Sequence, residues 1–369
     1  GPCRRQLWLD ERGTSGDLAE FFVRCECGKS RPLYEASEIE LNPLGFCTGR
    51  RPWLGAGSSE SCKERSRLLV RTASNAYFPQ VVSVLSLPDR GTDAEKVVRE
   101  LWQFLQAVDT EEHLETFERL PKVAAKLAPY THEKVLDAIR SIKAGGAAER
   151  PVKQVELEAI LEAPEGFGDD VPIDPDFHVR RLPERAWRQR GDLGEVEAVY
   201  QLHRLREVMA LAGFSRFEAV MPDINGEYDT DVELAQIQLE PKWFPAVENH
   251  GEGVFVSLRA SAVKDWLNRA EVVERLSALE SGHREWAQQH KSQRPFPGGP
   301  YVLLHTLSHL LIQSLAMRAG YSASSIRERI YSESESERYG VLLYTGSSDA
   351  EGTLGGLVGE ARNIYDHLQ

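Results

Sequence analysis

All five cysteines of this 369-residue chain lie within its first 62 residues, and none follows. An odd number of cysteines in a chain that opens without a secretory signal argues against a disulfide framework. Thiolates are soft ligands, four of them complete a tetrahedral zinc site, and the glycine after Cys27 permits the tight turn of a zinc knuckle. The clustering therefore predicts a small structural Zn²⁺ module, with buried free thiols as the alternative.

The predicted zinc ligands are Cys25, Cys27, Cys47 and Cys62. Their separations are less regular than those of paired Cys-x-x-Cys motifs. The remaining thiol, Cys3, is an alternative to Cys27 or part of a site completed by residues upstream. Because the chain opens on Gly1-Pro2 without a methionine, we expect either a tag-cleavage remnant or a start within a longer sequence.

The charge of the chain is unevenly distributed. Overall, 44 Lys and Arg face 57 Asp and Glu, a formal net charge of −13, which disfavours a stand-alone protein that coats DNA. Residues 1–71, in contrast, hold 12 basic and 10 acidic side chains. The positive charge peaks in a basic island from Cys47 to Arg71, and three of its arginines are candidate DNA contacts: Arg50, Arg51 and Arg71. A solvated face or a protein contact is the more common role of such an island.

The pattern of the chain predicts three parts: a cysteine-rich zinc module over 1–91, a helical insertion with an acidic linker over 92–176, and a C-terminal α/β domain over 177–369. Apolar residues at helical spacing predict helices from residue 92 onward and at about 194–212, and a segment rich in apolar residues predicts a helix at about 302–318. The sequence predicts strands at 20–24, 68–71, 253–258 and 340–345. A strand, a glycine-rich loop and a helix in succession are typical of α/β structure, so we expect a mixed α+β fold. No run approaches the ~20 apolar residues of a membrane span.

Two histidines, His305 and His309, stand one turn apart on one face of the helix predicted near the C-terminus. This is the spacing of metal ligands, but Thr306 takes the position of the glutamate base in His-Glu-x-x-His metalloproteases. The simplest interpretation is polar positions on a mostly buried helix, hydrogen-bonded to a neighbouring strand. A binding pocket is the second interpretation, so both are candidate pocket residues.

The glycine-rich segment near the C-terminus and the aromatic residues give little indication of a catalytic site. The glycine-rich segment 346–359 could cradle an anion at the following helix, but it lacks the Walker A lysine, and Asp349 and Glu351 would repel phosphate. Aromatic side chains at Trp53, Trp243 and Phe244 are expected to fill a core rather than to stack on bases. We therefore do not expect enzymatic activity of the chain itself.

Several segments together resemble one family: Cys47–Gly55, Arg71–Pro79, Leu202–Val208, Trp243–Glu248 and Leu304–His309, with Leu343-Tyr344 and Gly355-Gly356. In combination they are similar to the DrmB family of the bacterial DISARM anti-phage system. The C-terminal portion of that family is similar to a domain of MrfA-type DNA helicases.

The resemblance implies a non-catalytic partner of a DrmA-like DNA helicase, which supplies the ATPase and engages DNA within a cytoplasmic complex. By position it implies that the four cysteines at 25, 27, 47 and 62 are the thiols of the zinc module. It implies contact with DNA through the complex and none with membranes. Two alternatives stand beside it: an independent nucleic-acid-binding module, and a degenerate phosphodiesterase-like nuclease that uses His305 or His309.

Overall fold

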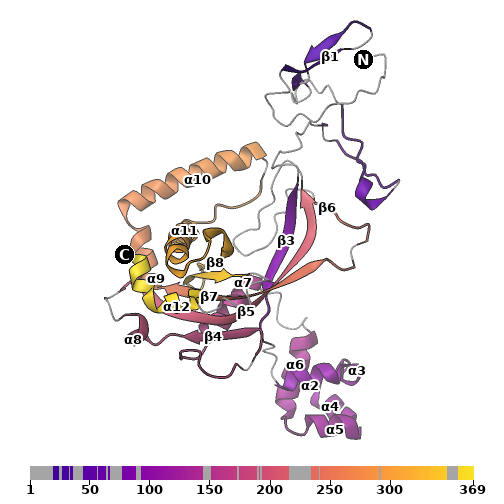
Figure 1. Ribbon diagram of the computed structural model, residues 1–369. Helices are drawn as coiled ribbons and strands as arrows, with labels where there is room; N and C mark the ends of the chain where they lie inside the picture. Colours follow the sequence, from indigo (N-terminus) through magenta and orange to yellow (C-terminus); the bar gives the residue numbers. More distant parts are fainter. Residues whose placement is uncertain are drawn as a thin grey trace. The chain divides into compact units, whose positions relative to one another are not determined.

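A computed structural model of the chain describes residues 20–24, 27–32, 34–35, 45–55, 57–63, 65–66, 77–88, 93–143, 151–172, 174–188, 191, 193–215, 234–240, 242–290, 292–346 and 356–369. The chain divides into two compact units. Figure 1 labels their helices and strands. The first comprises Gly1–Val82, Met209–Met221 and Tyr228–Val247, and the second Ser83–Val208, Pro222–Glu227 and Glu248–Gln369.

The cysteine-rich region of the first unit is built from short pieces. Strands β1 (Phe22–Arg24) and β2 (Ser30–Pro32) form an antiparallel pair, and η2 (Pro52–Leu54) is a short 3-10 helix. The strand expected at 20–24 is therefore confirmed. The strand expected at 68–71 lies outside the described residues.

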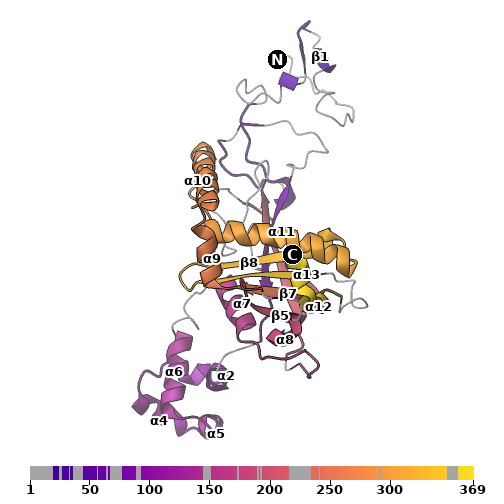
Figure 2. The same cartoon turned by 90° about the vertical axis from the view of Figure 1, so that its left-hand side faces the viewer.

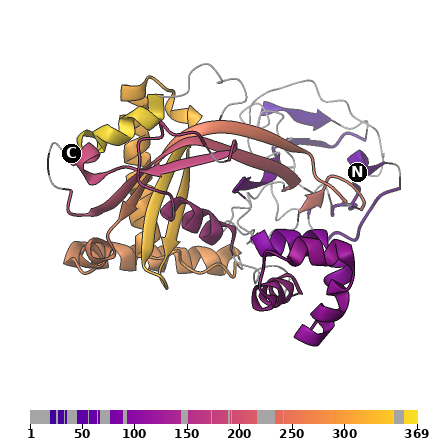
Figure 3. The same ribbon diagram turned by 90° about the horizontal axis from the view of Figure 1, so that it is seen from below.

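The central sheet has seven strands: β3 (Phe78–Leu85), β4 (Phe177–Arg181), β5 (Val196–Ser215), β6 (Ala235–Gln236), β7 (Ala246–Leu258), β8 (Ile326–Glu333) and β9 (Arg338–Thr345). Its strand order is β3-β5-β7-β9-β8, and β4 and β6 also pair with β5. The long strands β5 and β7 curve side by side (Figure 3). Since the β4–β5, β5–β6, β7–β9 and β8–β9 pairs are antiparallel, the expected mixed α+β fold is confirmed.

The helix predicted at about 194–212 is wrong, because this segment is strand β5. A bulge explains the misleading spacing of its apolar residues. Arg204 pairs with His178 whereas Leu202 pairs with Val179, so His203 is one extra residue in β5. The extra residue reverses the alternation of faces, and Leu202 and Leu205 consequently enter the same core although they are three positions apart.

The two faces of the sheet bury separate cores. Alternate residues of β7 and β9 enter different clusters: Val254 and Val341 pack with helix α11 (Gly299–Ala319), whereas Phe255 and Leu342 pack with helix α7 (Val152–Leu161). Figure 2 shows α11 and α7 on opposite sides of β8. The core on the α11 side is completed by α9 (Ala260–Leu267), α12 (Gly356–Glu360), η5 (Ala361–Asn363) and α13 (Ile364–Leu368).

Five consecutive helices between the first strand of the sheet and α7 have a core of their own: α2 (Asp93–Glu100), α3 (Trp102–Leu105), α4 (Glu111–Glu118), α5 (Pro121–Leu127) and α6 (His132–Lys143). The helical stretch expected from residue 92 onward is thus confirmed. The remaining elements are α8 (Glu184–Trp187), α10 (Ala270–His290) and η4 (Ala323–Ser325). None of the helices in the described part of the chain combines the length and apolar character needed to cross a membrane.

Candidate metal centre

Helix α11 is fixed on the sheet by one apolar stripe. It begins after Gly298 and ends at Gly320, which has a left-handed backbone with φ 75°. Leu304, Leu311 and Leu315 are buried along the stripe that faces β8 and β9. His305 and His309 lie one position beyond this stripe, at the border between the covered face and solvent, and their side chains are 47% and 60% exposed.

Strand β8 directs a carboxylate at this border. Ile326 and Ile330 enter the core beneath α11, so Glu328, midway between them, points from the same face of the strand. The Glu328 side chain is 25% exposed. Strand and helix together therefore bring one carboxylate under two imidazoles.

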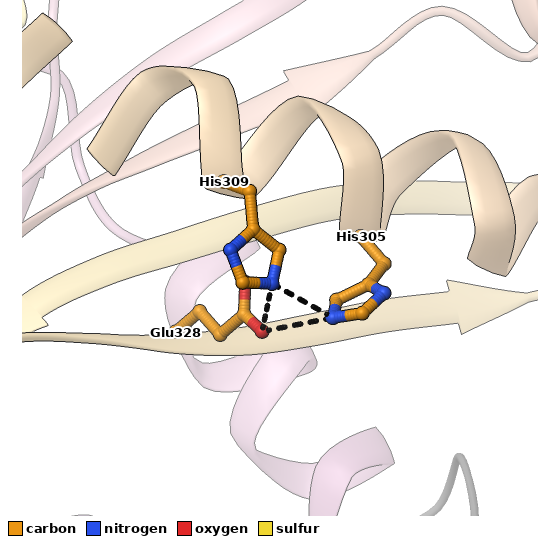
Figure 4. A group of neighbouring side chains, drawn as sticks. All are labelled: His305, His309 and Glu328. Carbon is orange, nitrogen blue, oxygen red and sulfur yellow. Dashed lines mark hydrogen bonds and ion pairs between the residues drawn. The ribbon is translucent and has the colours of Figure 1, made fainter. Parts of the chain in front are cut away.

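The three side chains converge through single atoms (Figure 4). Nε2 of His309 lies 3.0 Å from Nε2 of His305. Oε1 of Glu328 lies 3.4 Å from Nε2 of His305 and 3.8 Å from Nε2 of His309. Among the residues that the structure describes, these three side chains form the one group of three or more that could hold a metal ion.

Neighbouring residues hold the cluster in place. The buried Ser308 hydroxyl donates to Oε2 of Glu328, which leaves Oε1 for the histidines, and it lies 2.8 Å from the carbonyl oxygen of His305. The Tyr301 ring stacks on His305 with centroids 5.8 Å apart. Burial and the Glu328 carboxylate raise the pKa of Tyr301, so this phenol stays neutral.

The two histidines are half-exposed and contact the neighbouring strand through Glu328. The contact with the strand agrees with the simplest sequence interpretation, but the exposure of the two side chains does not. Glu328 is the residue that sequence reasoning missed. Its only signal is an alternating pattern, in which apolar Ile326 and Ile330 flank a carboxylate on one face of a strand.

The predicted cysteine ligands are only partly described. Cys27 and Cys47 are exposed, Cys62 is half-buried, and Cys25 lies outside the described residues. Gly49, at φ 63°, donates its backbone N–H to Sγ of Cys47 at 3.3 Å. An added Cβ at Gly49 would lie 1.9 Å from the Glu60 carbonyl oxygen, so this turn requires glycine. The cysteine ligand set stays a prediction.

The candidate DNA-contacting arginines differ from one another. Arg50 is exposed and forms an isolated bridge with Ser59. The Arg51 guanidinium is instead bonded to the Glu60 carboxylate, and its side chain is 19% exposed. Arg71 lies outside the described residues. Arg50 is therefore the described member of the set that presents its charge to solvent.

The aromatic side chains of the first unit are more exposed than a core role predicts. Trp53 is 46% exposed, Trp243 67% and Phe244 45%. Trp53 contacts Phe214 edge-on at 5.0 Å and donates its indole N–H to the Gln236 carbonyl oxygen at 2.8 Å. The expectation that these residues fill a core is wrong for Trp243 and Phe244.

The anion-cradle alternative near the C-terminus lacks support from the helix that follows the loop. The loop at 347–355 lies outside the described residues. At the beginning of α12, the backbone N–H of Leu357 donates at 2.8 Å to Oε1 of Glu252, a carboxylate from β7 that is 1% exposed. A carboxylate of the same chain thus takes this place at the beginning of the helix.

Comparison with known families and proteins gives three matches. A domain of unknown function, DUF8724, matches residues 1–78, and the MrfA Zn-binding domain matches residues 307–368. The chain is 30% identical to the DISARM protein DrmB of Bacillus paralicheniformis over 96% of its own length. It spans 63% of the length of that relative. The similarity confirms the resemblance found in the sequence.

Proposed function

Since this chain is a relative of the DISARM protein DrmB, we propose that it acts in bacterial anti-phage defence as the non-catalytic partner of a DrmA-like DNA helicase in the cytoplasm. The observation that carries the proposal is the combination of two matches on one chain. Similarity to DrmB covers 96% of the chain, and its C-terminal part matches the zinc-binding domain of MrfA.

The sequence supports the proposal that the partner, and not this chain, supplies the ATPase. The only Gly-Lys-Ser/Thr step in the 369 residues is Gly28-Lys29-Ser30, and Val23 stands where a Walker A loop has its first glycine, so the chain has no complete Walker A loop to hold nucleotide phosphates. A helicase-associated domain without its own ATPase needs a partner that supplies one. In this arrangement the helicase-associated zinc module acts in trans on the motor.

Contact with DNA is assigned to the first unit. This unit combines the exposed charge of Arg50 with exposed aromatic rings at Trp53, Trp243 and Phe244. Basic side chains neutralise phosphates and aromatic rings stack on unpaired bases, which are the two terms that dominate single-strand binding. The acidic composition of the whole chain makes this contact weak without the helicase.

Co-expression with the DrmA-like helicase tests the partnership. We expect the two chains to co-purify through affinity capture on either one and to elute together in size-exclusion chromatography. Elution of two separate chains at micromolar concentration, with unchanged helicase ATPase when they are mixed, would contradict the proposal.

Charge reversal of Arg50 tests the DNA contact. Because Arg50 has an exposed charge whereas Arg51 is bonded to Glu60, Arg50→Glu changes the surface without breaking that pair. We expect weaker binding of single-stranded DNA by the complex and a salt slope smaller by about 0.7 in log K against log salt. The matched control is Arg140→Glu on α6, whose side chain is 69% exposed and far along the chain from the island. An equal effect of the two variants would assign the difference to net charge.

A structural Zn²⁺ in the cysteine module is a separate part of the proposal. Binding and folding are coupled in closed thiolate sites, so Cys47→Ser should increase hydrogen exchange over residues 20–88 more than in the C-terminal half. Elemental analysis should show that the variant loses about one zinc per chain. Full metal content and unchanged exchange in the variant would remove Cys47 from the ligand set.

The nuclease alternative gains one observation, because Glu328 supplies a third metal ligand beside the two histidines. It is tested on labelled single- and double-stranded DNA with magnesium, manganese or zinc. Under the proposed function the isolated chain leaves both substrates intact. Cleavage by the wild type that disappears in a His305→Ala/His309→Ala variant would establish the nuclease instead.

A further inference from the structure

We propose that His305, His309 and Glu328 bind one divalent transition metal ion, with zinc as the best-fitting ion. The proposal goes beyond the helicase partnership and does not depend on it. Two imidazoles and one carboxylate are the protein ligands of open zinc centres and of several iron centres. The same donors are brought together here by α11 and β8.

The distances between the donor atoms agree with a tetrahedral ion. Zinc bonds of about 2.0–2.2 Å place the donors of a tetrahedron about 3.3–3.6 Å apart, against about 3.0 Å between neighbouring donors of an octahedron. The three separations here are 3.0, 3.4 and 3.8 Å. They bracket the tetrahedral value, so an ion enters with only small movements of the side chains.

Hydrogen bonding satisfies this arrangement less well than a metal does. A neutral imidazole carries one N–H, so an Nε2–H that donates across the 3.0 Å to the other Nε2 leaves Oε1 of Glu328 without a histidine donor, and one that donates to Glu328 is directed away from the other Nε2. If both Nε2 atoms carry hydrogen, the two donors face each other. A cation among the three atoms accepts all of their lone pairs at once.

The surroundings have the form of a supported ligand set. The buried Ser308 hydroxyl holds Oε2 of Glu328, so the carboxylate presents Oε1 alone to the histidines. The Tyr301 ring stacks on His305 and limits its rotation. Hydrogen bonds and packing of this kind orient metal ligands and raise their affinity.

The site differs from the predicted cysteine module in both chemistry and place. Residues 307–368, which match the MrfA Zn-binding domain, contain no cysteine, but they include His309 and Glu328, and His305 lies two positions before the first of them. The exposed histidine edges leave the fourth position of a tetrahedron to water or to a partner group. A bound metal there would remain open to exchange.

Titration of the full chain with Co²⁺, after removal of metals by a chelator, tests the site. Thiolate-bound cobalt shows a charge-transfer band in the near ultraviolet, whereas cobalt held by histidine and carboxylate shows visible bands alone, so the two sites are read separately. We expect a class of bound cobalt without thiolate bands in the wild type. It should be absent from the His305→Ala/His309→Ala variant and from Glu328→Gln, and Zn²⁺ should displace it.

Two further variants make the result specific. Ser308→Ala should weaken cobalt binding by about 10–100-fold, because it removes the hydrogen bond that orients the carboxylate. His250→Ala, an exposed histidine on β7, should leave it unchanged. Absence of the thiolate-free class from the wild type, or its survival in the double histidine variant, would overturn the proposal. Helicase co-purification is scored independently, so failure of one proposal is distinguishable from failure of the other.

Discussion

Strand β8 directs ionisable side chains toward both faces of the sheet, and the surroundings of these side chains differ between the two faces. Toward α11, Glu328 meets two imidazoles at the border with solvent. Toward α7, its neighbour Arg329 is 8% exposed and meets two buried carboxylates, Glu156 and Glu207. Adjacent residues of one strand thus enter an open cluster on one side and a closed network on the other.

In the closed network the carboxylate oxygens are matched by donors. Arg329 bonds both oxygens of Glu156 at 2.9 and 3.0 Å and Oε1 of Glu207 at 3.2 Å. Tyr331 donates to Glu156 at 3.1 Å, and Tyr344 donates to Glu207 at 2.7 Å. Burial raises the pKa of Tyr344 to about 12, with the Glu207 carboxylate acting in the same direction, so its proton stays in place.

The comparison teaches which polar cluster is available for a ligand. Donors already occupy the carboxylates of the closed network, and its side chains are almost fully buried. The open cluster has three possible metal-ligand atoms within 4.8 Å of one another, and two of them are partly exposed imidazole nitrogens. The first arrangement stabilises the fold, and the second is suited to binding a cation.

The largest effect on stability is expected from removing the arginine of the closed network. Arg329→Met leaves Glu156 and Glu207 buried without their shared cation, which should lower the free energy of unfolding by about 3–5 kcal/mol. Urea denaturation followed by circular dichroism measures the change. Arg140→Met on α6 is the control, because that side chain is 69% exposed, and its effect should stay within about 0.5 kcal/mol. Equal stability of the two variants would show that the buried pairing contributes little.

A smaller effect is expected from Ser83, whose hydroxyl donates to Glu207 and accepts from Arg329. Ser83→Ala removes one neutral member and leaves both charges in place. We expect a loss of about 1–2 kcal/mol by the same urea measurement. Because the two sites share a network, Arg329→Met and Ser83→Ala should combine to less than the sum of their separate effects. Additive losses would indicate that the two residues act independently.

Much of the fold on both faces of β8 could be predicted from the sequence, and the failures have physical causes. Helix α11 and strand β9 could be predicted because each is a run rich in apolar residues, of a length that fits a helix or a buried strand. Strand β5 was read as a helix because the bulge at His203 imitates helical spacing. A local window records the spacing of apolar residues but not the pairing that shifts their faces.

Two of the three residues of the candidate metal site could be predicted from the sequence. Two histidines at helical spacing can be found from the sequence, because both lie on one element. Glu328 could not, since its proximity depends on how α11 packs across β8. The four cysteines show the opposite case: their residue type indicates a metal, whereas the ligand geometry depends on turns that sequence spacing does not specify.

A pH-dependent effect is expected from a second pair of histidines, His178 and His203, which lie 5.4 Å apart between ring centroids in β4 and β5. Burial is the largest cause that lowers the pKa of both histidines. The charge of Arg180 lowers the pKa of His178 further, and His178 lowers the pKa of His203, whereas Asp170 raises both. As the pH falls below about 6.5, the unfolded chain takes up protons that the native pair does not, so the free energy of unfolding decreases.

Urea denaturation at about pH 8 and about pH 5.5 measures this dependence. His178→Gln/His203→Gln should lose less stability than the wild type between the two conditions, because neither state then titrates at these positions. His250→Gln on β7 is the matched control and should keep the wild-type dependence. Identical slopes for the wild type and the double variant would mean that the pair is protonated equally in both states.

The smallest effect on the metal-free protein is expected from the open side of β8. Glu328 is 25% exposed and, among the residues that the structure describes, pairs with two histidines rather than with the guanidinium that Glu156 and Glu207 share. In Glu328→Gln the amide oxygen still accepts from Ser308, so the free energy of unfolding without metal should change by no more than about 0.5 kcal/mol. With zinc at about 100 times its dissociation constant, the wild type should gain about 2.7 kcal/mol from this site, and the variant should not. A variant that is strongly destabilised without metal, or that gains the same stability from zinc, would mean that Glu328 belongs to the fold as Glu156 does.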